Sequence, residues 1–145
     1  MSIDDDVVAA NGEFYAAIES GHVDRIVALW DDAEDISCVH PGWPPVRGRS
    51  RVARSWAVIM ANTAYLQFFP TEVNVTVAGD VAIVGCEHSV LARITDSEDG
   101  LGETARVVAT NVFRRRADGW RLWAHHASPV LTATDTTAPD DGDRT

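Results

Sequence analysis

The spacing of apolar residues along the chain changes near Leu66. Before that point, large apolar side chains recur about every 3.6 residues, which is the period of one face of a helix. This spacing predicts three helices, over about residues 2–20, 23–31 and 48–62. Gly21, directly after the first of them, is typical of a helix end. The first half of the chain should therefore be mainly helical.

After Leu66, apolar and polar residues alternate, which is the pattern of strands with one face in a core. The predicted strands cover about residues 72–78, 80–95, 103–116 and 120–130, and a shorter one covers residues 36–40. Helices followed by a run of strands predict an α+β fold, in which three N-terminal helices pack into a curved antiparallel sheet. Three short helices can hardly fill such a sheet, so we expect a small cavity at its open end.

The length of 145 residues fits one domain, which we expect over residues 1–131. In residues 132–145, Asp is mixed with Thr, Pro, Ala and Gly without any apolar period, and this predicts a disordered acidic tail. Cys38 and Cys86 lie in apolar stretches without CxxC spacing. We interpret them as two reduced, buried thiols rather than a disulfide or a metal site.

The net charge of −10 argues against two classes of partner. Nucleic acids and anionic lipids are bound mainly through clustered Lys and Arg, so we expect neither nucleic acid nor a membrane as a partner. The N-terminal residues lack the basic and apolar segments of a signal peptide, and no run of 18 apolar residues occurs. These features predict a cytoplasmic protein.

Several short motifs together resemble one protein family. They are GHVDRIVALW at residues 21–30, VHPGW at 39–43 leading to Gly48-Arg49, TNVF at 110–113, DGWRL at 118–122 and HHASP at 125–129. The pattern, over about residues 5–130, resembles the SnoaL-like branch of the nuclear transport factor 2-like superfamily. The resemblance implies a cone-shaped fold and commonly a homodimer formed through the sheet. That superfamily includes isomerases, dehydratases, hydrolases and cyclases, as well as non-catalytic association domains.

His40 and His126 are the candidate catalytic residues. Each lies at the end of a predicted strand, and imidazole titrates near neutral pH, so either could transfer a proton or orient a ligand oxygen. Strand alternation places His126 and Ser128 on the cavity face of the last strand and His125 on the outer face. The alternative is that His40 and His126 are buried neutral histidines bonded to the backbone.

Candidate ligand-binding residues are Trp30, Trp43, Trp56, Asn111 and Ser128. Tryptophan offers a large flat surface with one donor, which suits an apolar or aromatic ligand, although Trp30 and Trp56 also fit a packed core. Trp43 stands in a proline-rich loop where the cavity mouth is expected. Asn111 lies in the middle of a strand, where its amide needs a partner.

Two neighbouring titratable residues, a glutamate and a histidine, lie in the predicted strand over residues 80–95. Glu87 and His88 are adjacent and project from opposite faces of their strand, and the solvated outer face is the simpler place for Glu87. The histidines lack HxH or HxxxH spacing, so we expect no metal, and no motif indicates a cofactor.

Two function classes remain open. The first is a protein that binds a small apolar or aromatic molecule, in its enzymatic form a cofactor-independent lyase, isomerase or hydrolase that works by proton transfer. The second is a non-catalytic dimerisation or association module with a filled cone. The cavity distinguishes them, because an enzyme needs an open pocket with a titratable group inside.

Overall fold

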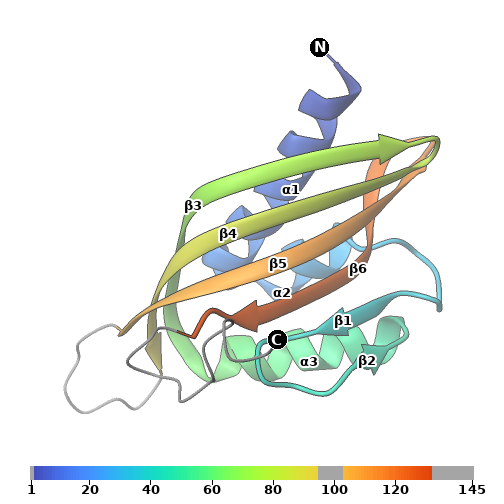
Figure 1. Cartoon of the computed structure of the whole chain (residues 1–145). Coiled ribbons are helices and arrows are strands. Elements are labelled where there is room, and N and C mark those ends of the chain that lie inside the picture. Colours follow the sequence, from blue (N-terminus) through green and yellow to red (C-terminus); the bar gives the residue numbers. More distant parts are fainter. Residues whose placement is uncertain (1, 95–102, 132–145) are drawn as a thin grey trace, which may run out of the picture.

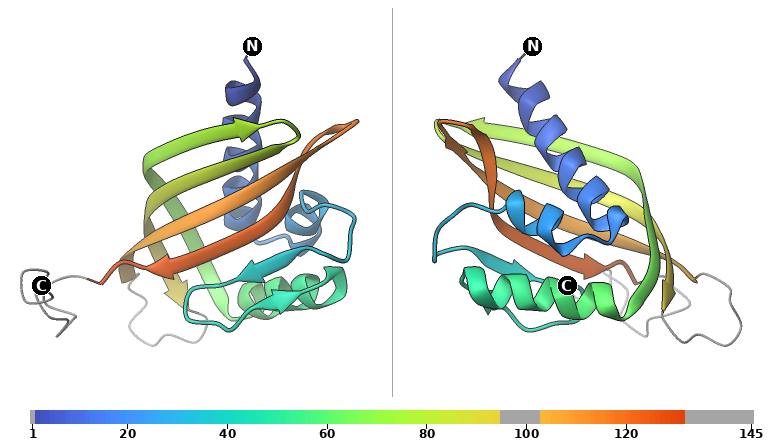
Figure 2. Two further views of the ribbon diagram at one scale, coloured as in Figure 1. Left: turned by 45° about the vertical axis from the view of Figure 1, so that its right-hand side comes forward. Right: turned by 180° about the vertical axis from the view of Figure 1, so that it is seen from behind.

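The computed structural model describes residues 2–94 and 103–131, in which three helices pack on one side of a curved, six-stranded sheet (Figure 1). The helices are α1 (Ile3–Ser20), α2 (Val23–Ala28) and α3 (Arg49–Ala61). The view from behind in Figure 2 shows all three on the inner face, with α3 across the lower end. The predicted tail at residues 132–145 lies outside the described residues.

The sheet has the order β2-β1-β6-β5-β4-β3. Its strands are β1 (Ser37–Val39), β2 (Val46–Arg47), β3 (Thr63–Ala78), β4 (Val81–Ile94), β5 (Glu103–Arg116) and β6 (Gly119–Pro129). The four long strands are antiparallel, as predicted, whereas the short β1 pairs with β6 in parallel and makes the sheet mixed. The predicted change from helices to strands near Leu66 is confirmed, with β3 beginning three residues earlier.

The α2 helix ends three residues before its predicted end because the sheet takes up the following backbone. Leu122 in β6 donates its N–H to the carbonyl of Leu29 at 2.9 Å, and Asp31 donates its N–H to the carbonyl of Leu122 at 2.8 Å. These bonds form an isolated parallel bridge between Trp30 and Leu122. Residues 29–31 therefore leave the helix and extend the sheet edge.

Strand β6 contains one extra residue. Val112 pairs with Ala124, but the next residue, Phe113, pairs with Leu122, so Trp123 has no partner of its own in β5. As a result of this bulge, Leu122 and His125 are both buried, although they are three residues apart and strict alternation would place them on opposite faces. The two halves of β6 are thus out of phase with each other.

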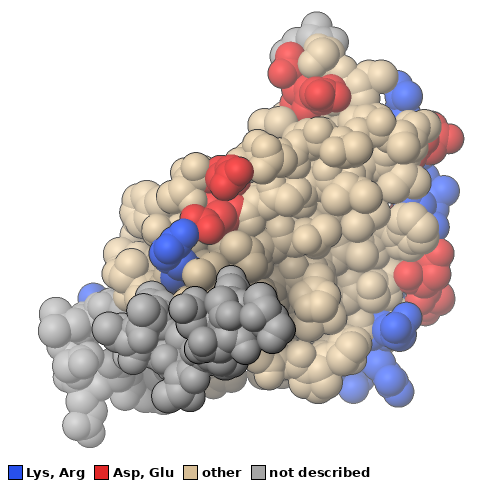
Figure 3. All heavy atoms as spheres, viewed as in Figure 1, with Lys and Arg blue, Asp and Glu red and all other residues tan. Residues whose placement is uncertain are grey.

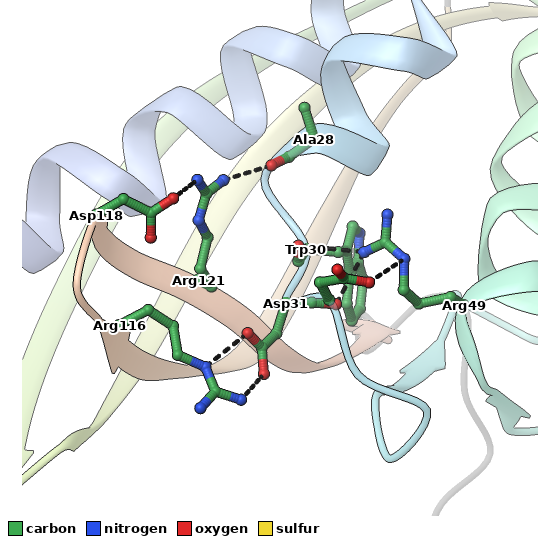
Figure 4. Close-up of a pocket in the computed structure, with 8 residues that line it drawn as sticks. Ala28, Trp30, Asp31, Arg49, Arg116, Asp118 and Arg121 are labelled. Carbon is green, nitrogen blue, oxygen red and sulfur yellow. Dashed lines mark hydrogen bonds and ion pairs between the residues drawn. The ribbon is translucent and has the colours of Figure 1, made fainter.

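Asp31 joins the segment after α2 to strand β5 (Figure 4). Its carboxylate accepts two bonds from Arg116, at 2.8 and 2.6 Å, and lies 2.7 Å from Arg114. Its carbonyl accepts a bond from Arg49 of α3 at 2.8 Å. The Asp31 side chain is 4% exposed, so these arginines replace water as its partners.

The outer face of the sheet carries few charged side chains over a broad central area (Figure 3). Cross-strand rows without Asp, Glu, Lys or Arg lie there, including the row Thr76, Ile83, Val112 and Ala124 and the row Asn74, Gly85, Thr110 and His126. Ile83 and Val108 are exposed on this face although they are large and apolar. No helix in the described part of the chain is long and apolar enough to cross a membrane.

The Asp31→Asn variant tests whether the ion pairs between Asp31 and the arginines of β5 stabilise the fold. Hydrogen bonding to Arg116 lowers the pKa of Asp31 in the folded chain. The resulting stabilisation is present above about pH 4, the ordinary range of a free Asp, and is lost as the pH falls through the lower folded pKa. We expect urea denaturation at pH 7 to show a loss of about 2 kcal/mol, between the values for exposed and buried pairs.

The matched control is Asp118→Asn, because Asp118 pairs with Arg121 in the same region but is exposed. This control should change the free energy of unfolding little. The difference between Asp31→Asn and the unchanged chain should shrink as the solution is acidified below about pH 4. An equal loss of unfolding free energy in the two variants would show that the Asp31 ion pairs are no more stabilising than an exposed one.

Candidate functional site

A cavity of about 680 Å³ lies between the inner face of the sheet and the helices α1 and α3. Its wall is mainly apolar and includes the aromatic rings of Tyr15, Trp43, Trp56 and Phe68. Its volume is within the range of small-molecule sites. The cone is therefore not filled by its own described side chains.

Three histidines line this cavity: His40, His88 and His125. Each is at most 5% exposed. Burial lowers the pKa of His40 to about 4 and that of His125 to about 3, and it also lowers the pKa of His88. All three imidazoles are therefore neutral at pH 7, and each has one N–H donor and one lone pair.

His125 is oriented by a chain of buried amides. Its Nδ1 lies 2.6 Å from Oδ1 of Asn111, which is fully buried. The Asn111 amide nitrogen donates to Oδ1 of Asn11 at 2.8 Å and to the Tyr15 hydroxyl at 3.1 Å. The amide oxygen of Asn111 thus faces the imidazole, and Nδ1 must carry the proton. The lone pair of His125 is on Nε2.

His40 is oriented by Ser55 of α3. The Ser55 hydroxyl donates its proton to the carbonyl of Val52 at 2.7 Å, so it can only accept from Nε2 of His40, at 2.8 Å. The lone pair of His40 is therefore on Nδ1, which lies 3.9 Å from Sγ of Cys38. The ring packs edge-on against Trp56, with 4.6 Å between the ring centroids.

His88 of β4 is the third histidine, and it differs from the other two. Its ring lies 4.1 Å from the Tyr15 ring and 5.5 Å from the Phe68 ring, measured between centroids. Within the described part of the chain, neither of its nitrogens has a hydrogen-bond partner. The imidazole also lines a smaller cavity of about 290 Å³ beside α1 and β3, so it lies where the two cavities approach each other.

The predicted orientation of His126 and Ser128 is wrong. Both are exposed on the outer face of the sheet, whereas His125 and Ala127 are buried and line the cavity. The bulge at Trp123 is the physical reason, since it reverses the alternation for the rest of β6. Alternation counted from Leu122 does not reveal an extra residue, so the strand pattern placed His125 on the wrong face.

The other candidate residues separate into three places. Trp43, Trp56 and His40 line the cavity, and Asn111 lies behind the wall as the partner of His125. Trp30 is 2% exposed in the core and does not line the cavity. His88 was not among the predicted site residues. It has the same parity as the buried apolar residues of β4, and this is the signal that could have identified it.

Glu87 lies on the outer face, as its predicted solvated position requires. Its carboxylate accepts a bond from Arg106 at 2.6 Å and one from Thr71 at 3.1 Å, and the bond from Arg106 is the main cause of its lowered pKa. It therefore belongs to a surface ion pair of the sheet and makes no contribution to the cavity.

A second, polar pocket lies beside Asp31 (Figure 4). Its arginines, Arg49, Arg116 and Arg121, are bonded to carboxylates or backbone carbonyls of the same pocket. It is therefore a structural ion network rather than a prepared anion site. Among the described residues, no group of three His, Cys, Asp or Glu side chains is arranged to hold a metal ion.

Comparison with solved structures finds close likeness over most of the chain. A protein from Streptomyces avermitilis, whose name reads "putative dehydratase from the NTF2-like family", is 48% identical over 89% of this chain and 96% of its own, with a TM-score of 0.80. A Thiobacillus denitrificans protein, whose name reads "putative calcium/calmodulin-dependent protein kinase type II association domain", is 31% identical over 86% of this chain and 94% of its own, with a TM-score of 0.73.

A more distant neighbour shows that the fold extends beyond close sequence likeness. A nuclear transport factor 2-like superfamily protein from Salmonella enterica serovar Typhimurium is 16% identical over 94% of this chain and 97% of its own, with a TM-score of 0.82. The comparison with curated proteins found no match. The family model described as a SnoaL-like domain matches residues 7–132. The chain therefore belongs to the SnoaL-like domain family, within the nuclear transport factor 2-like superfamily.

Proposed function

We propose that the chain binds a small, largely apolar molecule in the main cavity and transfers a proton within it, as a cofactor-independent lyase or isomerase. The observation that carries the proposal is an apolar cavity of about 680 Å³ with three neutral histidines in its wall. An association module does not need such a space and can fill it with side chains. The 48% identity to a protein named as a dehydratase, which is a type of lyase, favours the same class.

His125 is the best-placed group for the proton transfer. Its Nε2 has the lone pair, and Asn111 holds the ring in one orientation. A pKa of about 3 makes the isolated imidazole a weak base. Negative charge that develops on a bound ligand beside the ring would raise this pKa, so proton transfer and charge development favour each other. The lone pair of His40, at Nδ1, lies 3.9 Å from Sγ of Cys38, whose thiol can donate to it, so His40 is less available than His125.

We also propose that the chain forms a homodimer through the outer face of the sheet. The support is the broad area with few charges in Figure 3, with Ile83 and Val108 exposed in it. Trp123 is half-buried, and the guanidinium of Arg114 lies over its ring, 4.2 Å from the centroid, so it offers little exposed apolar area. The association domain that is 31% identical is consistent with assembly through this fold.

The first test of ligand binding uses 1-indanone, a neutral bicyclic ketone, as a probe in thermal and chemical denaturation. A ligand at 100 times its dissociation constant adds about 2.7 kcal/mol of stability, so saturation should raise the free energy of unfolding measurably. The affinity should be constant from about pH 7 to pH 9, because burial holds the pKa of each cavity histidine below its ordinary value near 6.5. A transition near pH 6.5, or no binding of this or any related probe, would contradict the proposal.

The neighbouring variants His125→Gln and His126→Gln test which histidine serves the cavity. Glutamine can still donate to Asn111, but it does not place a lone pair where Nε2 of His125 lies. Calorimetry with 1-indanol, whose hydroxyl can donate to that lone pair, should show about a fivefold loss of affinity for His125→Gln. His126→Gln should bind like the unchanged chain, and an equal loss in both variants would refute the assignment.

The dimer is tested by light scattering at micromolar concentration together with the variant Ile83→Lys. Stable interfaces typically bury about 800 Å² on each partner, and a charge in the centre of an apolar interface should prevent association. We expect a mass of twice 15.7 kDa for the unchanged chain and a monomer for Ile83→Lys. The control Ala57→Lys changes an exposed residue of α3, on the other side of the sheet, and should leave the dimer intact. A monomeric unchanged chain would end this proposal.

A further inference from the structure

His88 is a buried polar group without a polar contact in the described chain. It is 3% exposed, and both its nitrogens lack hydrogen-bond partners among the described residues. Folded proteins pair nearly all such groups, because a buried polar group without a partner destabilises the fold. Local violations of this rule are expected at functional sites. The His88 ring lines the cavity while its nitrogens are covered by neighbouring atoms, so a rotation of the ring is needed for an N–H to face a ligand.

A count of N–H donors shows what His88 offers. The single proton of neutral His40 is bonded to Ser55, and that of His125 is bonded to Asn111. Both rings therefore present lone pairs, whereas His88 keeps its N–H free. The indole N–H of Trp56 is the second lining donor without a partner in the described part of the chain. His88 and Trp56 are thus the two buried lining donors that a ligand oxygen would pair, beside the hydroxyls of Tyr15 and Thr63 and the more exposed indole of Trp43.

The charge of the wall determines which oxygen-bearing molecules can enter. The described residues that line the main cavity include no Arg, Lys, Asp or Glu. A carboxylate or phosphate placed there would lose its hydration without gaining a cation, which is strongly unfavourable. Arg49, Arg116 and Arg121 line the separate polar pocket instead, where they are bonded to carboxylates or backbone carbonyls. The cavity thus favours uncharged molecules.

We propose that His88 binds the carbonyl oxygen of a neutral, mainly hydrocarbon ligand of the ketone, aldehyde or lactone class, by donating its free N–H, and that the cavity rejects carboxylates and phosphates. This inference rests on the proposed function, because it names the chemical class of the ligand for the same cavity. Trp56 can donate a second bond to the same oxygen or to another one on the ligand. The lone pairs of His40 and His125 then suit a hydroxyl group of the ligand.

Three probes of nearly equal size separate these claims: indane, 1-indanone and indane-1-carboxylate. Calorimetry or ligand-observed NMR with the unchanged chain should show 1-indanone binding at least about five times more tightly than indane, the value of one hydrogen bond, and no detectable binding of the carboxylate. His88→Leu should remove the preference for the ketone, so that 1-indanone and indane bind equally. His126→Leu makes the same change on the outer face and should keep the preference.

A second readout needs no ligand. Replacing a buried group without a partner by an apolar one should raise the midpoint of thermal unfolding, so His88→Leu should be more stable than the unchanged chain. A lower midpoint would assign His88 a structural role and overturn its role as a ligand contact.

The outcomes distinguish this inference from the function on which it rests. If none of the three probes binds the unchanged chain, the small-molecule proposal and the inference both fail. If the neutral probes bind but His88→Leu keeps the preference for the ketone, the role of His88 alone is refuted. If the carboxylate binds as tightly as the ketone, the restriction to neutral ligands is refuted.

Discussion

The buried amide of Asn111 connects the helical layer to the sheet and sets the chemistry of the cavity. It is fully buried in β5, and its hydrogen bonds reach Asn11 and Tyr15 of α1 and His125 of β6. Because an unpaired amide in the core is costly, α1 must lie where its two polar residues meet Asn111. The same bonds fix the tautomer of His125. One interaction therefore determines both how α1 packs and which nitrogen faces a ligand.

The cavity that results is electrically neutral and has polar groups at defined places. Desolvation lowers the pKa of its three histidines, and its described wall contains no carboxylate that would restore their positive charge. An Asp at the position of Asn111 would favour an imidazolium at His125, whereas an amide does not. The ionic groups of this end of the fold are instead concentrated around Asp31, where they join strands and helices.

The fold could be predicted from the sequence because its signals are local. The change in apolar period near Leu66, the glycine turns and the length of the strands each depend on neighbouring residues, and all agree with one architecture. The site was predicted less well, because it depends on pairing between distant segments. The bulge at Trp123 and the pairing of Trp30 with Leu122 arise from contacts across the sheet, and we find no local sequence signal near either position that predicts them. His40, Trp43 and Trp56 were located because a loop or helix, rather than β6, places them.

The extra residue in β6 also affects how positions are compared between relatives. Counted in steps of two from Leu122, the inward position is His126, but counted back from Ala127 it is His125. A relative that lacks the bulge would have one residue fewer between the hairpin and the cavity. An ungapped alignment with such a relative would equate an inward residue with an outward one over half of the strand. Transfer of site residues to such a relative therefore requires a gap at Trp123, placed by comparison of structures.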